Sequence, residues 1–218
     1  MKVQGKREVS TLTRLERKKI GDEELASEAA KSKESLSELL DGISSTNPKV
    51  KFRSAKILRI LSERNPKMLY SNWEFFEKLL DSQNNILKWN AIDIIANLTR
   101  QDSSHKFDRL YNKFYGALLY EGSLITAGHV VSGSSKIAKA RPDLQDKITK
   151  ELLNVERVPL PTEECRNILI GHTIKAFDAY LDQIKDKNEI TSFVKRQLNN
   201  SRRATKAKAE KLLRKLEK

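Results

Sequence analysis

The feature that most constrains this chain is a pattern of small and apolar residues that recurs at intervals of 37, 36 and 38 residues. Its anchor positions are Ser54, Ala91, Ala127 and Cys165. Apolar residues stand three and four positions after each anchor, and usually seven, which is the spacing of the stripe on an amphipathic helix. The residues at these positions are Ile57, Leu58 and Leu61; Ile94, Ile95 and Leu98; Val130, Val131 and Ser134; and Ile168, Leu169 and His172. The pattern predicts equivalent helices in an all-α chain.

Each of these helices is followed by a polar turn and a second predicted helix. Pro66 and Pro142 lie at two of the turns, and proline is favoured in the first turn of a helix. The second helices have apolar stripes of their own, such as Trp73, Phe76, Leu79 and Leu80. A helix pair of this length buries its apolar face only against the next pair, so such pairs stack. We predict repeats over residues 36–218 and, over residues 1–35, a basic and polar capping segment with a helix from near Asp22 to Leu40.

Three stretches connect the pattern with a known repeat class. "NPKVKFRSAKIL" resembles the HEAT repeat, "ANLTRQDS" is similar to the asparagine-bearing helix of the armadillo repeat, and "KARPDL" looks like the usual turn between paired helices. The resemblance covers about residues 36–218. It implies a right-handed α–α superhelix, a HEAT/armadillo-type solenoid of about five helix pairs, with a partner bound on the concave face.

The formal net charge of +13 is concentrated at the two ends of the sequence. Residues 1–20 carry a net charge of +5 and residues 195–218 a net charge of +8, so the residues between them are balanced. The basic stretch "SRRATKAKAEKLLRKLEK" still has an apolar face of Ala209, Leu212, Leu213 and Leu216. A terminal repeat must present a polar outer face to water. We therefore expect a basic C-terminal cap on the solenoid.

Binding of nucleic acid is the alternative explanation of the basic ends, because lysine and arginine side chains neutralise phosphates. The candidate contacts in the C-terminal stretch are Arg202, Arg203, Lys206 and Lys208. The middle of the chain lacks the regularly repeated bases that a nucleic-acid groove would need. The sequence therefore favours the cap.

The sequence contains no motif that predicts a cofactor or a metal, and only one short pair of residues that suggests catalysis. Nucleophile, phosphate-loop and dinucleotide signatures are absent, and the three histidines lie in different repeats. We predict a protein that is not an enzyme and needs no cofactor, with His172 in the core. The single cysteine, the lack of a signal-like N-terminus and the lack of a long apolar run favour a cytoplasmic protein without a membrane partner.

One short motif favours an enzyme as a third possibility. Trp89 and Asp93 lie four residues apart and share a helix face. They look like the Trp-x-x-x-Asp pair of the HEAT-like alkylpurine DNA glycosylases, in which an aromatic ring and a carboxylate meet the damaged nucleotide. Those enzymes carry a second acid after the tryptophan, whereas this chain has Asn90. Glycosylase activity therefore ranks below binding.

The main hypothesis is a binding or scaffold module with a protein partner on its concave face. The first helix of the third predicted repeat contains four small residues, Gly128, Ser132, Gly133 and Ser135. They favour tight packing between helices over the close approach of a partner. The predicted partner contacts are the polar residues that line the inner row of helices: Arg53, Lys56, Asn90, Asp93, Asn97, His129 and Asn167. The partner's identity and the oligomeric state stay open.

Overall fold

The computed structural model describes residues 10, 11, 13, 15 and 20–217, which are helical or lie in turns and include no β-strand. The predicted all-α class is therefore confirmed. The chain divides into two compact units, Met1–Gln101 and Asp102–Lys218. The predicted boundary between residues 35 and 36 differs from this division, because it falls inside a helix of the first unit. The division also separates the two helices of the predicted second repeat.

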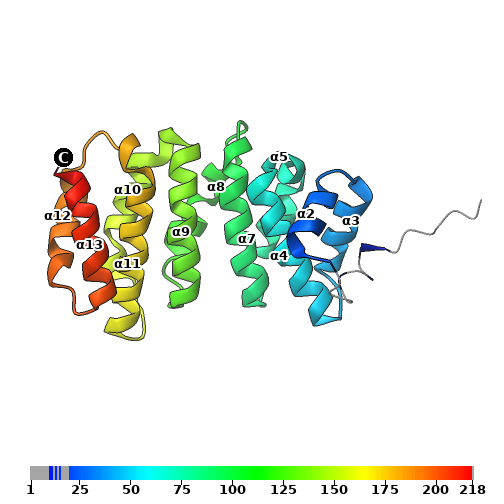
Figure 1. The fold of residues 1–218 in the computed structure, drawn as a ribbon, viewed down its shortest axis with the longest axis horizontal. Coiled ribbons are helices and arrows are strands. Elements are labelled where there is room, and N and C mark those ends of the chain that lie inside the picture. The colour runs from blue at the N-terminus through cyan, green and yellow to red at the C-terminus, as the bar shows by residue number, and fades with distance from the viewer. Residues whose placement is uncertain (1–9, 12, 14, 16–19, 218) are drawn as a thin grey trace, which may run out of the picture. The chain divides into compact units, whose positions relative to one another are not determined.

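The first unit is built from two layers of helices (Figure 1). One layer contains α2, α4 and α7, which lie side by side, and the other contains α3, α5 and α6. The bounds are α2 (Asp22–Ala29), α3 (Lys33–Gly42), α4 (Pro48–Arg64), α5 (Pro66–Leu69), α6 (Trp73–Leu79) and α7 (Asn85–Leu98), with short 3-10 turns η1 (Tyr70–Asn72) and η2 (Thr99–Gln101).

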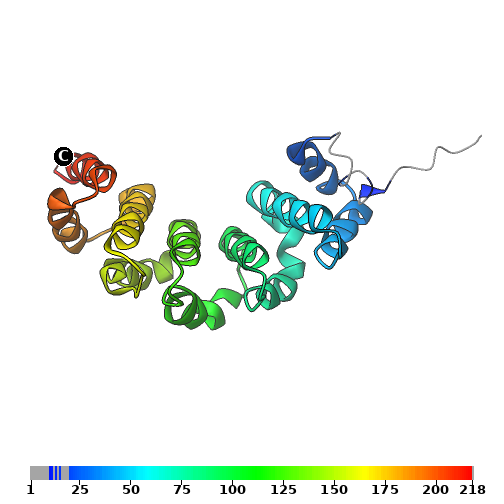
Figure 2. The ribbon, with the colours of Figure 1, turned by 90° about the horizontal axis from the view of Figure 1, so that it is seen from below.

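The second unit repeats this two-layer arrangement (Figure 2). Helices α9, α11 and α13 lie side by side, and the other layer contains α8, α10 and α12. The α-helices are α8 (Lys106–Asn112), α9 (Leu124–Ala140), α10 (Gln145–Leu153), α11 (Glu163–Tyr180), α12 (Asn188–Arg196) and α13 (Arg203–Leu216). A π-helix η3 (Lys113–Leu118) continues α8, and the 3-10 turns are η4 (Pro142–Leu144), η5 (Val155–Arg157), η6 (Leu181–Gln183) and η7 (Gln197–Asn199).

Polar residues in the predicted turns start the long helices. The side chains of Asn47, Asn84, Ser123 and Thr162 each accept a hydrogen bond from a backbone N–H in the first turn of the helix that follows. Such caps satisfy donors that have no partner within the helix. The same chemistry corrects one prediction. Ser32 caps α3 through the N–H of Ser35, so the single helix expected from Asp22 to Leu40 is in fact two helices, α2 and α3.

The apolar stripes of the first three predicted helices are confirmed, since every stripe residue of α4, α7 and α9 is buried. The stripe of α11 was placed one residue too early. Leu169, Ile170 and Thr173 are buried, whereas Ile168 and His172 are half-exposed. Three consecutive apolar residues at positions 168–170 fit either register, and Thr173 takes the interior position because its hydroxyl donates to the carbonyl oxygen of Leu169. His172 is therefore not a core residue.

A buried arginine ties the start of α8 to the end of α9. The guanidinium of Arg141 is 3.2 Å from Asp102 Oδ2, 2.7 Å from Asp108 Oδ1 and 2.6 Å from Asp143 Oδ2. Asp102 also accepts the backbone N–H groups of Lys106 and Phe107 at the start of α8. The Asp102 side chain is 0% exposed and that of Arg141 is 6% exposed, so each charge depends on the other for its solvation.

The ion pairs of Arg141 also make the stability of this corner depend on pH. The hydrogen bond from Arg141 holds the pKa of Asp143 below its usual range, although partial burial opposes the shift. A carboxylate whose pKa is lowered by folding stabilises the fold above its unfolded pKa of about 4 and loses that contribution as the pH falls further. The contribution of this pair is therefore complete at neutral pH.

We predict that Arg141→Met lowers the free energy of unfolding by about 3 kcal/mol, because it leaves the carboxylate of Asp102 buried without its counter-charge. Arg196→Met is the matched control, since Arg196 pairs with Glu156 at 2.9 Å on the surface. Its cost should stay below about 1 kcal/mol. Urea unfolding followed by circular dichroism measures both, and equal losses would contradict the structural role given to Arg141.

Candidate partner-binding site

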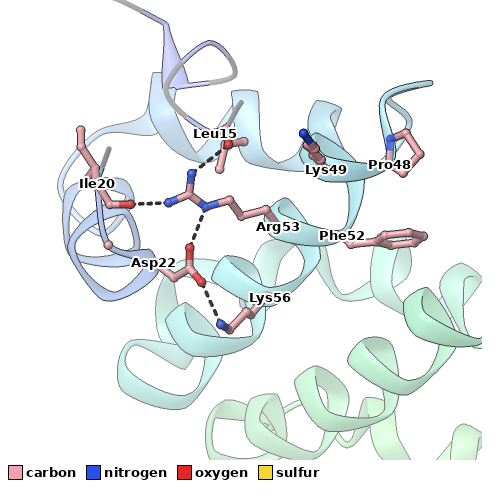
Figure 3. Close-up of a pocket in the computed structure, with 9 residues that line it drawn as sticks. Leu15, Ile20, Asp22, Pro48, Lys49, Phe52, Arg53 and Lys56 are labelled. Carbon is pink, nitrogen blue, oxygen red and sulfur yellow. Dashed lines mark hydrogen bonds and ion pairs between the residues drawn. The ribbon is translucent and has the colours of Figure 1, made fainter. Parts of the chain in front are cut away.

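The predicted contact Arg53 is engaged inside the first unit (Figure 3). Its Nε donates to Asp22 Oδ1 at 2.7 Å, and its two terminal nitrogens donate to the backbone oxygens of Leu15 and Ile20. Lys56 pairs with the other oxygen of Asp22 at 2.9 Å. Partial burial alone would raise the pKa of Asp22, but the hydrogen bonds and the positive charges of Lys56 and Arg53 together lower it. Arg53 therefore joins α4 to the segment before α2.

A cavity of about 630 Å³ opens beside these ion pairs. Its walls combine apolar and charged side chains: Leu15, Ile20, Asp22, Pro48, Lys49, Phe52, Arg53 and Lys56 line it, together with Gly21 (Figure 3). The cationic groups of Arg53 and Lys56 point at Asp22. A ligand in this cavity would therefore meet cations that already have an anionic partner.

The other predicted contacts in the first unit belong to α7 and differ in exposure. Asn97 is 3% exposed and donates to the hydroxyl of Ser62 at 2.8 Å, so its placement on a binding face is wrong. A buried amide needs a hydrogen-bond partner, and the bond from Asn97 to Ser62 joins α7 to α4. Asn90 and Asp93 are half-exposed, and the side chain of Asn90 donates to the backbone oxygen of Ile86. Trp89 is also half-exposed and lies one turn from Asp93.

In the second unit, Asn167 likewise makes hydrogen bonds within the fold. Its amide donates to the hydroxyl of Ser201 and accepts from the side chain of Asn200, both at 2.9 Å. Its backbone oxygen accepts from the hydroxyl of Thr205 at 2.7 Å. Asn167 is buried, so its prediction as a partner contact is also wrong. It attaches α13 and the preceding turn to α11.

His129, in contrast, lies in an accessible groove between α9 and α11. The groove has a volume of about 290 Å³, and we call it the histidine groove. It is lined by Leu124, Ile125, Gly128, His129, Ile168 and His172. Ile125 is 52% exposed, which is unusual for a large apolar side chain among the described residues. A Cβ atom added at Gly128 would meet nothing within 4 Å. This glycine therefore leaves open space and is not needed for helix packing, contrary to the preferred interpretation of its sequence.

Two lysines lie close to His172: Lys175 follows it by one turn of α11, and Lys208 of α13 bonds to the backbone oxygen of Gly171. Partial burial lowers the pKa of His172, and the positive charges of Lys208, Lys175, Arg202 and His129 lower it further. We call Lys175, Arg202 and Lys208 the cationic rim. Partial burial also lowers the pKa of Lys208, and the positive charges of Arg202 and Lys175 lower it further. A histidine whose pKa is lowered by folding costs stability once the pH falls below its unfolded value of about 6.5.

The cationic rim overlaps the predicted nucleic-acid contacts. Arg202 pairs with Glu164 at 2.8 Å, and Lys208 Nζ donates to the backbone oxygen of Gly171 at 3.1 Å. Arg203 and Lys206 are exposed on α13. Sequence reasoning missed Ile168, His172 and Lys175 of α11 as site residues because the predicted register of that helix is shifted by one position. It missed Ile125 of α9 because an apolar residue in an amphipathic helix gives no signal of exposure. The predicted basic residues Lys2, Lys6, Arg7, Arg14, Arg17, Lys18 and Lys19 lie outside the described residues.

Helix α13 is an integral part of the second unit. Thr205, Ala209 and Leu212 are buried, and Leu213 and Leu216 are half-exposed. The helix approaches α11 closely at Gly171, where an added Cβ would lie 2.8 Å from the hydroxyl oxygen of Thr205 and 3.3 Å from Lys208 Nζ. This close approach places the ammonium group of Lys208 at the backbone oxygen of Gly171, the residue before His172.

Within the described part of the chain, no group of three or more His, Cys, Asp or Glu side chains could hold a metal ion. None of the helices described is long and apolar enough to cross a membrane. No protein-family model matches the chain, and no curated protein matches it significantly. The histidine groove and its cationic rim are therefore interpreted from their own chemistry.

Two glycine-to-alanine substitutions in neighbouring helices should have opposite effects. Gly171→Ala should lower the free energy of unfolding by about 1–3 kcal/mol, because the new methyl group overlaps the buried side chain of Thr205. Gly128→Ala should raise it by up to about 1 kcal/mol, because alanine favours the helix and meets no neighbour.

Chemical unfolding of both variants and of Gly171→Ala/Thr205→Ala measures these effects. The double variant lacks the overlapping hydroxyl, so its loss should be smaller than the sum of the losses in the two single variants. Stabilisation by alanine at both glycines would show that α13 does not approach α11 as described.

Proposed function

We propose that this protein is a non-enzymatic binding module that recognises an acidic segment of a partner protein on the surface of α9, α11 and α13. The histidine groove with its cationic rim is the observation that carries the proposal. We further propose that the helix pairs form a HEAT/armadillo-like right-handed superhelix and that the protein acts in the cytoplasm. The stacking of helices within each unit and the single free cysteine support these two points.

A protein segment fits the groove because apolar and cationic groups lie together there. Ile125 and Ile168 offer contacts to an apolar side chain, and the rim offers contacts to carboxylates. Single-stranded nucleic acid is usually bound on exposed aromatic rings. Every Phe and Tyr of residues 102–217 is buried except Tyr120, whose nearby charges are Glu151 and Arg157 on the opposite layer. The groove therefore favours a protein over nucleic acid.

Nucleic-acid binding is the second candidate, and the exposed bases of α13 favour it. Arg203, Lys206 and Lys211 project into solvent near the C-terminal end of the sequence. Such a site would contact phosphates along α13 and would not require the groove. The two functions therefore depend on different residues of the same unit.

Filling the groove should abolish partner binding without harming the fold. Gly128→Met places a flexible side chain in the open space above the helix, whereas Gly128→Ala leaves the groove open. Proteins captured by the wild type and by Gly128→Ala should be depleted at least about ten-fold with Gly128→Met, a loss typical of a blocked central contact. Quantitative mass spectrometry of immobilised-protein pull-downs measures the depletion. Equal capture by all three proteins would reject this groove as the binding site.

The salt dependence of binding distinguishes the nucleic-acid alternative from the proposed binding of a protein. Fluorescence anisotropy with a labelled oligonucleotide gives the slope of log affinity against log salt concentration. If α13 binds phosphates, Arg203→Gln/Lys206→Gln should reduce that slope by about two, whereas Gly128→Met should not change it. This result, together with unchanged protein capture by Gly128→Met, would favour the second function over the first.

A further inference from the structure

The histidine groove brings two imidazoles from neighbouring helices to one opening. His129 belongs to α9 and His172 to α11, and both line the groove together with apolar side chains. Gly128 of α9 also lines the groove, and the space beside its Cα atom is open. A ligand can therefore approach the imidazoles and the apolar wall at the same time.

The cations at this opening outnumber the acids that neutralise them. Arg202 is paired with Glu164. Lys175 is exposed and makes no ion pair within the described residues, and Lys208 uses one of its three ammonium donors for the backbone oxygen of Gly171. The nearby carboxylate of Asp178 is paired with Lys215 at 2.5 Å. Lys175, Lys208 and His172 therefore lie on or beside α11 without an ion pair to an acidic side chain among the described residues.

The number of positive groups distinguishes between possible anions. A carboxylate carries one negative charge and two oxygens, whereas a phosphorylated side chain carries about 1.5–2 negative charges at pH 7 and three strong acceptor oxygens. His172 lines the groove, Lys175 follows it by one turn of α11, and Lys208 of α13 bonds to the backbone oxygen of the preceding residue, Gly171. An anion with several acceptors can therefore bond to more than one helix. Charge-assisted hydrogen bonds of this type are about twice as strong as neutral ones.

We propose that the histidine groove and its cationic rim form a subsite for a phosphorylated serine or threonine of the partner segment. Lys175, Lys208 and His172 hold the phosphoryl oxygens, and Ile125 and Ile168 contact an adjacent apolar residue of the segment. This inference rests on the proposed function as a protein-binding module, and it names the modification that the groove selects.

A set of synthetic peptides tests the subsite directly. The first is an acetylated, amidated heptapeptide with a central phosphoserine flanked by leucines and glutamates, and its twins carry serine or glutamate at the centre. Isothermal titration at pH 7 should show binding of the phosphoserine peptide that is at least about ten-fold tighter than that of either twin. Proton NMR of His172 should show that the phosphopeptide raises the pKa of the imidazole, because the bound dianion favours the charged form.

Substitutions identify the groups that recognise the phosphate. Lys175→Gln and His172→Gln should each reduce the advantage of the phosphoserine peptide over the serine peptide about ten-fold, with the serine peptide itself little affected. Lys150→Gln is the matched control, since Lys150 is an exposed lysine of α10 in the opposite layer. Circular dichroism and thermal unfolding verify that each variant is folded.

Each outcome separates this inference from the proposed function. Equal affinities for the three peptides, or no binding of any of them, would overturn the phosphate subsite, while protein capture that Gly128→Met abolishes would still support the binding module. A 5′-phosphorylated oligonucleotide serves as a further probe. If it binds more tightly than the phosphopeptide and loses that binding in Lys175→Gln, the groove reads a nucleic-acid phosphate, and a phosphorylated protein is excluded as the ligand.

Discussion

Side-by-side burial of apolar helix stripes is the interaction on which both units depend. Helix α4 packs on α7 in the first unit, and α11 packs between α9 and α13 in the second. Each contact removes the apolar surface of two helices from water, which is the main stabilising contribution to such stacks. The small anchor residues Ala91 and Ala127 are fully buried, and α13 approaches α11 closely at Gly171. The grooves and rims of the surface follow from this packing.

Polar residues at the seams between helices complete this packing. Asn97 bonds to Ser62, Asn167 bonds to the turn before α13, and Arg53 bonds to Asp22 at the start of α2. A buried polar group needs a partner, and these side chains find theirs on the neighbouring helix. Three of the residues that a periodic pattern places on a binding face therefore act as links between neighbouring helices. Periodicity alone does not distinguish a residue at the seam from one at the surface.

The sequence predicts the helices well and their details less well. The anchor pattern and the caps at Asn47 and Asn84 identify the long helices, because both signals are local. The sequence does not determine the register of α11, because the apolar run at residues 168–170 is compatible with two different buried stripes. The structure buries Thr173, whose hydroxyl donates to the carbonyl oxygen of Leu169. The break before α3 depends on the single cap of Ser32.

The candidate site was only partly foreseen. His129 was predicted from its place in the repeat, but His172 was assigned to the core and Lys175 was not considered. Their meeting depends on contacts between residues far apart in the sequence, such as Lys208 with Gly171. The ion pairs of Arg141 with Asp102 and Asp108 were likewise beyond local patterns, because these residues lie more than thirty positions apart.

Through the contact of Lys208 with the backbone at Gly171, helix α13 has two roles, one in packing and one in charge. Deleting the helix would remove both roles together. The helix that covers apolar surface of α11 also carries Lys208, whose ammonium group bonds to the backbone oxygen of Gly171 beside His172. Shortening the chain before α13 would therefore uncover apolar surface and remove positive charge in one step. During evolution, a change that strengthens the end of this stack would also adjust how strongly its neighbour attracts anions.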